Sequence, residues 1–125
     1  MQKVLVVDDS ATMRRMIIAS LSGLGDLDFE QAVSGLEAIE RISLAPMDLV
    51  VLDLNMPDVH GLEVLQFIRK QPSLEKLPVI VLTTRGDEDS RAAAHRHGAS
   101  LYLTKPFEPS TLAPEVERLL GRSAA

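Results

Sequence analysis

The chain has 125 residues, a formal net charge of -5 at pH 7 and no cysteine. Its length fits a single domain, and without cysteine it can form neither disulfides nor Cys-based zinc sites. Because no stripe of Lys or Arg extends beyond Arg14 and Arg15, the chain lacks the electrostatic footprint of a nucleic-acid binder. No apolar run has signal-peptide features or transmembrane length, so we expect a cytoplasmic protein that binds neither membranes nor nucleic acid.

Five short segments, most of them rich in Val, Leu or Ile, alternate with windows of helical spacing along the chain. The segments are residues 4–7, 28–33, 49–52, 78–82 and 101–103. Continuous apolar runs of this length are typical of strands that are buried on both faces of a parallel sheet. The sequence therefore predicts an α/β fold in which helices cover both faces of such a sheet.

Five helices are predicted, one after each strand. The second begins at a capping box of Ser34 and Glu37, and the fourth begins at Asp87 and ends near Gly98. The buried faces are expected to hold Met13, Met16, Ile17, Leu21 and Leu24 in the first helix, Ala38, Ile39 and Ile42 in the second, Leu62, Leu65 and Ile68 in the third, and Leu112, Val116, Leu119 and Leu120 in the fifth.

Polar side chains stand where four of the predicted strands end. Asp8 and Asp9 follow the first strand, Asp53 the third, Thr83 the fourth and Lys105 the fifth. Because the carboxyl ends of parallel strands share one edge of the sheet, we expect these side chains to gather there. Clustered carboxylates repel one another and need a cation, and oxygen ligands suit Mg²⁺. This edge is therefore expected to bind Mg²⁺ and a dianionic phosphoryl group.

The chain resembles the receiver domain of two-component response regulators, and stand-alone CheY-like members of the chemotaxis type most of all. The resemblance is carried by VLVVDDS, VVLDLNMPDVHGLEVL, VIVLTTRGD and GASLYLTKPF, and so extends over nearly the whole chain. It implies a flavodoxin-like fold of five βα units, doubly wound, with strand order 2-1-3-4-5. It also implies a receiver domain at residues 1–121 and a C-terminal tail at residues 122–125.

The same resemblance assigns roles to individual residues. Asp53 would accept the phosphoryl group, Thr83 would hydrogen-bond one phosphoryl oxygen, and Lys105 would pair with another. The Mg²⁺ ligands would be Asp8, Asp9, Asp53 and the backbone carbonyl of Asn55. The peptide bond between Lys105 and Pro106 would be cis.

The implied function is a signalling switch rather than an enzyme that acts on a separate substrate. A sensor histidine kinase or a phosphotransfer domain would supply the phosphoryl group, and the domain would catalyse its own phosphorylation and hydrolysis. Thr83 would then move toward the phosphoryl group and Tyr102 would turn inward. The altered surface would be formed by the fourth helix, the fifth strand and the fifth helix, and it would bind an unknown downstream protein. The switch itself would be a monomer. Candidate contacts on it are Arg91, His95, Tyr102 and Thr104.

Some features of the chain depart from this family or stand outside its site. Pro114 lies about five residues beyond the usual start of the fifth helix, and an interior proline removes a backbone hydrogen bond. The helix is therefore expected either to start late or to have an irregular first turn. The histidines His60, His95 and His97 lack metal-ligand spacing and are interpreted as surface or packing residues.

Three alternatives remain open on the sequence. Magnesium-dependent phosphatases with an aspartyl intermediate carry a second aspartate two residues after the nucleophile, where this chain has Asn55. A receiver fold can also act as a docking module without phosphorylation, although such modules typically lose an acidic residue or the lysine, and this chain keeps both. The chain could also be a receiver from a longer regulator or hybrid kinase.

Overall fold

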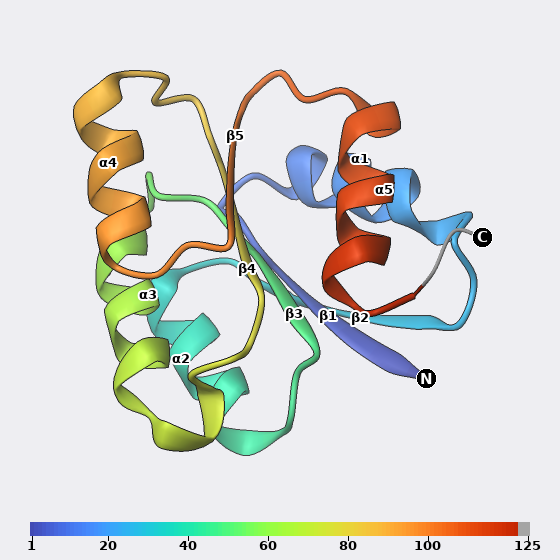
Figure 1. The fold of residues 1–125 in the computed structure, drawn as a ribbon, viewed down its shortest axis with the longest axis horizontal. Helices are drawn as coiled ribbons and strands as arrows, with labels where there is room; N and C mark the ends of the chain where they lie inside the picture. The colour runs from blue at the N-terminus through green and yellow to red at the C-terminus, as the bar shows by residue number, and fades with distance from the viewer. Residues whose placement is uncertain (123–125) are drawn as a thin grey trace.

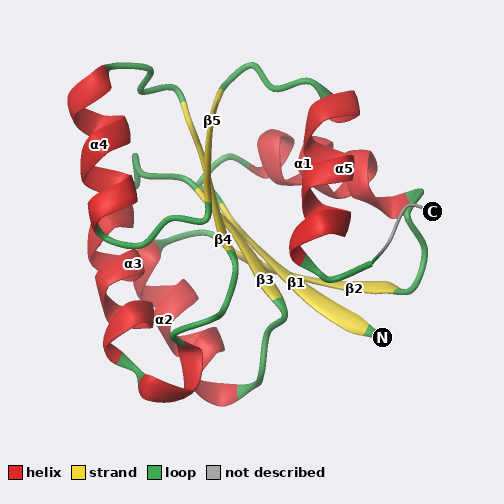
Figure 2. Cartoon of the chain, in the orientation of Figure 1, coloured by secondary structure: helices red, strands yellow, loops and turns green. Residues whose placement is uncertain are grey.

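Five parallel strands form the central layer of the structure, a computed structural model that describes residues 1–122. They are β1 (Gln2–Val7), β2 (Leu27–Ala32), β3 (Leu49–Leu52), β4 (Val79–Thr83) and β5 (Leu101–Thr104). The strand order is β2-β1-β3-β4-β5, and every neighbouring pair is parallel (Figure 2). The predicted doubly wound sheet with order 2-1-3-4-5 is confirmed.

Helices form the two outer layers (Figure 1). They are α1 (Ala11–Ser22), α2 (Gly35–Leu44), α3 (Gly61–Lys70), α4 (Glu88–Arg96) and α5 (Pro109–Leu119), with a short 3₁₀ helix η1 (Pro72–Leu74) after α3. The pair α1 and α5 covers one face of the sheet, and α2, α3 and α4 cover the other (Figure 1). Within residues 1–122, none of these helices combines the length and apolar content needed to cross a bilayer.

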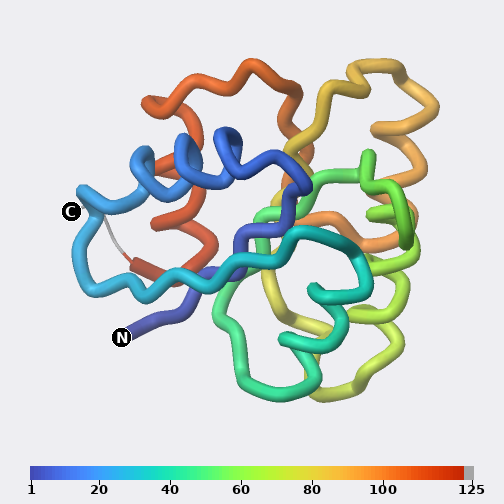
Figure 3. The backbone as a smooth tube through the Cα atoms, turned by 180° about the vertical axis from the view of Figure 1, so that it is seen from behind, coloured from blue at the N-terminus to red at the C-terminus, as the bar shows by residue number. Residues whose placement is uncertain are grey.

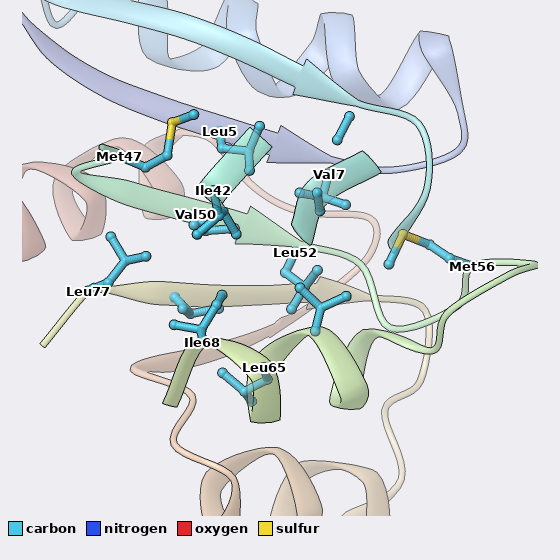
Figure 4. Close-up of a cluster of buried hydrophobic side chains, with 14 residues drawn as sticks. Leu5, Val7, Ile42, Met47, Val50, Leu52, Met56, Leu65, Ile68 and Leu77 are labelled. Atoms are coloured by element: carbon cyan, nitrogen blue, oxygen red, sulfur yellow. The ribbon is translucent and has the colours of Figure 1, made fainter. Parts of the chain in front are cut away.

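Each face of the sheet has its own hydrophobic core, because successive strand side chains point to opposite faces. Leu5 and Val7 of β1 pack toward α2 and α3, as Figure 4 shows. Val4 and Val6 pack toward α1 and α5. All four are fully buried, and burial of such side chains contributes about 1.5–3 kcal/mol each. This explains why the strand is apolar without alternation.

Side-chain caps fix where α1, α2 and α4 begin. Asp87 accepts the Ser90 N–H at 3.0 Å and opens α4, as predicted. Ser34 accepts the Glu37 N–H at 3.1 Å at the start of α2. The Glu37 carboxylate bonds the N–H of Val33, one residue before the donor of a standard capping box. Ser10, which the sequence analysis did not identify, caps α1 by accepting the Met13 N–H.

One residue of the predicted core is misplaced. Met16 was expected on the buried face of α1, but its side chain is 51% exposed. The buried face of α1 is centred on Ile17 and Leu21, one helical turn apart. Because α1 packs against both the sheet and the neighbouring α5, Ile18 on the other side of Ile17 joins the core in place of Met16.

The fifth helix begins at Pro109 and contains Pro114 in its interior. A late start is therefore wrong, and the helix accommodates Pro114, which has no N–H to donate, inside its second turn. In the first turn the Glu108 carbonyl accepts both the Thr111 N–H and the Leu112 N–H, a shared hydrogen bond that is common at helix ends. The fourth helix ends at Arg96, and Gly98 follows with φ of 98°, which confirms the predicted stop.

The two ends of the described chain lie near each other beside α1 and α5 (Figure 3). The Gln2 side chain donates to the Leu120 carbonyl at 3.0 Å. Arg122 donates to the carbonyls of Leu24 and Gly25 at 3.1 and 2.7 Å. Arg122 is thus held against the turn after α1, and residues 123–125 of the predicted tail lie outside the described residues.

Candidate functional site

Three aspartates meet at the carboxyl ends of β1 and β3. These strands are neighbours at the point where the strand order reverses, which is where ligands bind in such sheets. The Asp53 N–H donates to the Val7 carbonyl at 3.0 Å and fixes the end of β3 beside that of β1. One carboxylate oxygen from each of Asp8, Asp9 and Asp53 lies within 4.8 Å of the others. The topology therefore assembles the acidic cluster that the sequence predicts.

Lys105 reaches this cluster from the end of β5. Its Nζ lies 2.7 Å from Asp8 Oδ2 and 3.4 Å from Asp53 Oδ2. Its backbone N–H donates to the Thr83 carbonyl at 2.8 Å, and the Lys105–Pro106 peptide bond is cis, the isomer that the resemblance implies. A single ammonium group thus bridges two carboxylates that are almost completely buried.

Burial governs the electrostatics of Asp53. The residue is 4% exposed, and desolvation raises the pKa of its carboxyl above the ordinary value. The Asn55 backbone N–H, 3.1 Å from Asp53 Oδ1, and the Lys105 ammonium act in the opposite direction, while the negative charge of Asp8 adds to the increase. A partly desolvated carboxylate with one nearby cation is a suitable nucleophile for a phosphoryl group.

The Asn55 side chain links the β3–α3 loop to the end of β4. Its Nδ2 donates to Thr83 Oγ1 at 3.3 Å and to Thr84 Oγ1 at 3.1 Å. Thr83 is fully buried, whereas Thr84 and Asn55 are exposed. The sequence analysis assigned a role only to the Asn55 backbone carbonyl, because the amide's partners come from a strand that is distant in the chain.

The chemistry of the donor set fits Mg²⁺. Asp8, Asp9 and Asp53 offer only oxygen ligands, and Mg²⁺ prefers oxygen ligands and retains several waters. Asn55 follows Asp53 by two residues on the same loop. These residues would hold the ion, and the ion would neutralise charge on a phosphoryl group next to Asp53.

Tyr102 lies on β5 beneath α4 and is 3% exposed. Its hydroxyl donates to the Arg85 carbonyl. The Arg91 guanidinium lies over the ring, 4.8 Å from its centroid, and the His95 ring is 6.5 Å away. Of the four predicted contact residues, His95 and Thr104 are exposed, whereas Tyr102 is covered and Arg91 is half-buried against it.

Three residues that support the site were missed by the sequence analysis. Asp58 accepts the N–H groups of Gly35 and Leu36 at 3.1 Å each and fastens the β3–α3 loop to α2. His60 Nδ1 accepts the Leu62 N–H and caps α3. Arg14 contacts the backbone of Asp8. A polar residue just before an apolar helical window could have indicated His60, but the partners of Asp58 and Arg14 are set by tertiary contacts alone.

Comparison with known proteins gives consistent matches. The response regulator receiver domain family matches residues 4–117. The chain is 38% identical over 120 residues to the chemotaxis protein CheY1 of Helicobacter pylori, covering 95% of this chain and 97% of that protein. It is also 38% identical over 120 residues to the CheY homolog of Campylobacter jejuni, covering 95% and 92%. The structure of Vibrio cholerae CheY4 matches with a TM-score of 0.87 at 34% identity, covering 95% and 98%.

The family match covers most of the chain and includes every strand end that contributes to the acidic cluster. The matches to these relatives and to the solved structure each cover 95% of this chain. The resemblance seen in the sequence is therefore confirmed. The chain belongs to the response regulator receiver domain family of two-component signalling proteins, with chemotaxis proteins of the CheY type among its relatives.

Proposed function

We propose that the protein is a phosphorylation-activated switch in which Asp53 accepts a phosphoryl group from the phosphohistidine of a sensor kinase or phosphotransfer domain. The observation that carries this proposal is the position of Lys105, whose ammonium bridges Asp8 and Asp53 within the acidic cluster. A carboxylate nucleophile, an oxygen-rich metal site and a lysine are the groups that phosphoryl transfer to an aspartate requires.

In the proposed reaction a carboxylate oxygen of Asp53 attacks phosphorus, and the P–N bond of the phosphohistidine breaks. The electron pair of that bond remains on the leaving imidazole nitrogen, and an acyl phosphate forms on Asp53. Lys105 pairs with one phosphoryl oxygen, and the Thr83 hydroxyl donates a hydrogen bond to another. Attack by water on phosphorus later releases inorganic phosphate and restores the carboxylate.

The signal is proposed to pass from Thr83 to Tyr102. A phosphoryl group can favour a conformation only through contacts that differ between conformations, and the Thr83 hydroxyl provides such a contact. Because the Tyr102 ring is already buried under α4 here, phosphorylation is proposed to stabilise this position. The α4–β5–α5 surface would then bind a downstream protein, with the switch acting as a cytoplasmic monomer.

The test compares the parent protein with Asp53→Asn after incubation with Mg²⁺ and acetyl phosphate. Intact mass is expected to show one added phosphoryl group on the parent and none on the variant. Asp28→Asn is a matched control, since it removes an equal charge from an exposed position on β2. NMR shifts of the phosphorylated parent are expected to reach Tyr102 and α4.

Two results would overturn the proposal. Phosphorylation of Asp53→Asn to the same extent as the parent would exclude Asp53 as the acceptor. A parent that binds Mg²⁺ but gains no phosphoryl group would instead favour a docking module that works without phosphorylation.

A further inference from the structure

We propose that Arg14 is a positioning residue for Mg²⁺ binding, which acts by holding the backbone of Asp8 at the end of β1. The inference rests on the proposed function, because it assigns Arg14 to the metal site of that switch. Within the part of the chain that the structure describes, Arg14 forms no hydrogen bond or ion pair with the acidic carboxylates, so its effect would be exerted through the backbone of Asp8.

Arg14 joins three elements around the end of β1. It is the fourth residue of α1, and its Nη1 donates to the Asp8 carbonyl at 2.7 Å. Its Nε donates to Gln31 Oε1 on β2 at 2.9 Å. The backbone of Gln31 is held in the sheet, because β2 pairs with β1 and Gln31 lies opposite Val6. One planar guanidinium, anchored to a strand, thus fixes the carbonyl of a predicted metal ligand.

Every other polar group of Asp8 is also held. Its N–H donates to the Ala32 carbonyl at 3.1 Å, its Oδ1 accepts the Ser10 N–H at 2.9 Å, and its Oδ2 accepts Lys105 Nζ at 2.7 Å. Asp8 is 1% exposed, so a carbonyl that lost Arg14 would have little solvent to replace it. The peptide unit between Asp8 and Asp9 would then lose the hydrogen bond that orients it, and the two carboxylates would be less well placed relative to Asp53.

The sign of the effect separates this role from simple electrostatics. Removing a positive charge near an Mg²⁺ site should by itself strengthen binding of the cation. Losing a group that orients a metal ligand should weaken binding, typically by tenfold or more. A weaker Mg²⁺ affinity in a folded Arg14→Ala variant therefore cannot come from the lost charge and indicates lost positioning.

The experiment measures the Mg²⁺ dissociation constant by NMR titration of the Ser10 and Asn55 amides, without a phosphodonor. We expect it to rise about tenfold in Arg14→Ala and by a smaller factor in Gln31→Ala. Arg14→Lys keeps the charge and one donor, and is expected to recover part of the affinity. Arg15→Ala is the matched control, because Arg15 is exposed and, within residues 1–122, its one side-chain hydrogen bond is with Thr12 at 3.5 Å.

Each outcome decides the matter. An unchanged or stronger Mg²⁺ affinity in both Arg14→Ala and Gln31→Ala would overturn the role of Arg14 and leave the proposed function intact. A parent that binds no Mg²⁺ would overturn the proposed function and the role of Arg14 together. Urea unfolding of each variant checks its folding, and Gln31→Ala with Arg14→Lys decides the question if Arg14→Ala does not fold.

Discussion

At the scale of single residues, the site depends on a conflict between burial and charge. Asp8 and Asp53 are almost fully buried beside each other, and both lie within reach of Lys105. Buried carboxylates are costly unless they are paired with a cation. A chain optimised for stability alone would not place them there, which is typical of a functional site.

This conflict predicts how stability depends on pH. The pKa of Asp53 is raised from 3.8, chiefly by burial, so the folded protein binds this proton more tightly than the unfolded chain does. The stability contributed by protonated Asp53 is therefore lost as pH rises through the raised pKa. Asp53→Asn removes the titration, and its stability relative to the parent is expected to be greater at neutral than at acidic pH.

Urea unfolding in metal-free buffer at several pH values measures this difference. Asp28→Asn serves as the control, since it makes the same chemical change at an exposed position on β2. A stability difference between Asp53→Asn and the parent that stayed constant over the whole pH range would contradict the prediction.

At the scale of elements, α4 and β5 hold the Tyr102 ring between them. The Arg91 guanidinium covers one side of the Tyr102 ring, and the Arg85 carbonyl accepts the hydroxyl. The loop that carries Arg85 begins at Thr84, directly after Thr83 at the end of β4, so it borders both the acidic cluster and the tyrosine. The position of this ring is thus determined by a helix and a loop as well as by its strand.

Replacing Arg91 with Ala is expected to loosen the ring. A cation–π contact of this kind contributes about 0.5–1 kcal/mol, so the buried population should fall about two- to fivefold relative to the exposed one. Tyr102 is the only tyrosine and the chain has no tryptophan, so quenching of intrinsic fluorescence by acrylamide reports this ring alone. Arg96→Ala in the same helix is the control, and equal quenching of both variants would contradict the prediction.

At the scale of the whole molecule, the cores on the two faces of the sheet position the site. Leu52 belongs to the core between β3 and α3 and immediately precedes Asp53 (Figure 4). On the opposite face, Ile17 and Leu112 connect α1 and α5 to the same strands. The acidic cluster is therefore built on the most deeply buried part of the fold, which limits its motion.

Truncation of this core is expected to be severe. Leu52→Ala removes a fully buried side chain and should lower the free energy of unfolding by about 2–5 kcal/mol, because a cavity forms as apolar contacts are lost. Leu44→Ala changes a leucine that is 80% exposed and should alter stability by no more than about 0.5 kcal/mol. Urea denaturation measures both values, and comparable losses would contradict the arrangement of the core.

The sequence by itself determined the alternation of strands and helices and the identity of the strand-end residues. Residues 4–7 form a short, continuously apolar run that is typical of a buried strand, so Asp8 and Asp9 are expected at its end. The caps at Ser34 and Asp87 could also be predicted from the sequence, because each accepts the N–H of the residue three positions later. Patterns of this kind are local, and local geometry alone decides them.

Only the tertiary structure decided which distant groups meet. Four features depend on how the helices pack across the sheet. They are the exposure of Met16, the contact of Arg14 with Asp8, the attachment of Asp58 to α2 and the position of Arg91 over Tyr102. A helical period tells which residues share a face, but it does not tell how wide the covered part is. The partners of long polar side chains are chosen by packing in three dimensions, to which sequence spacing gives no access.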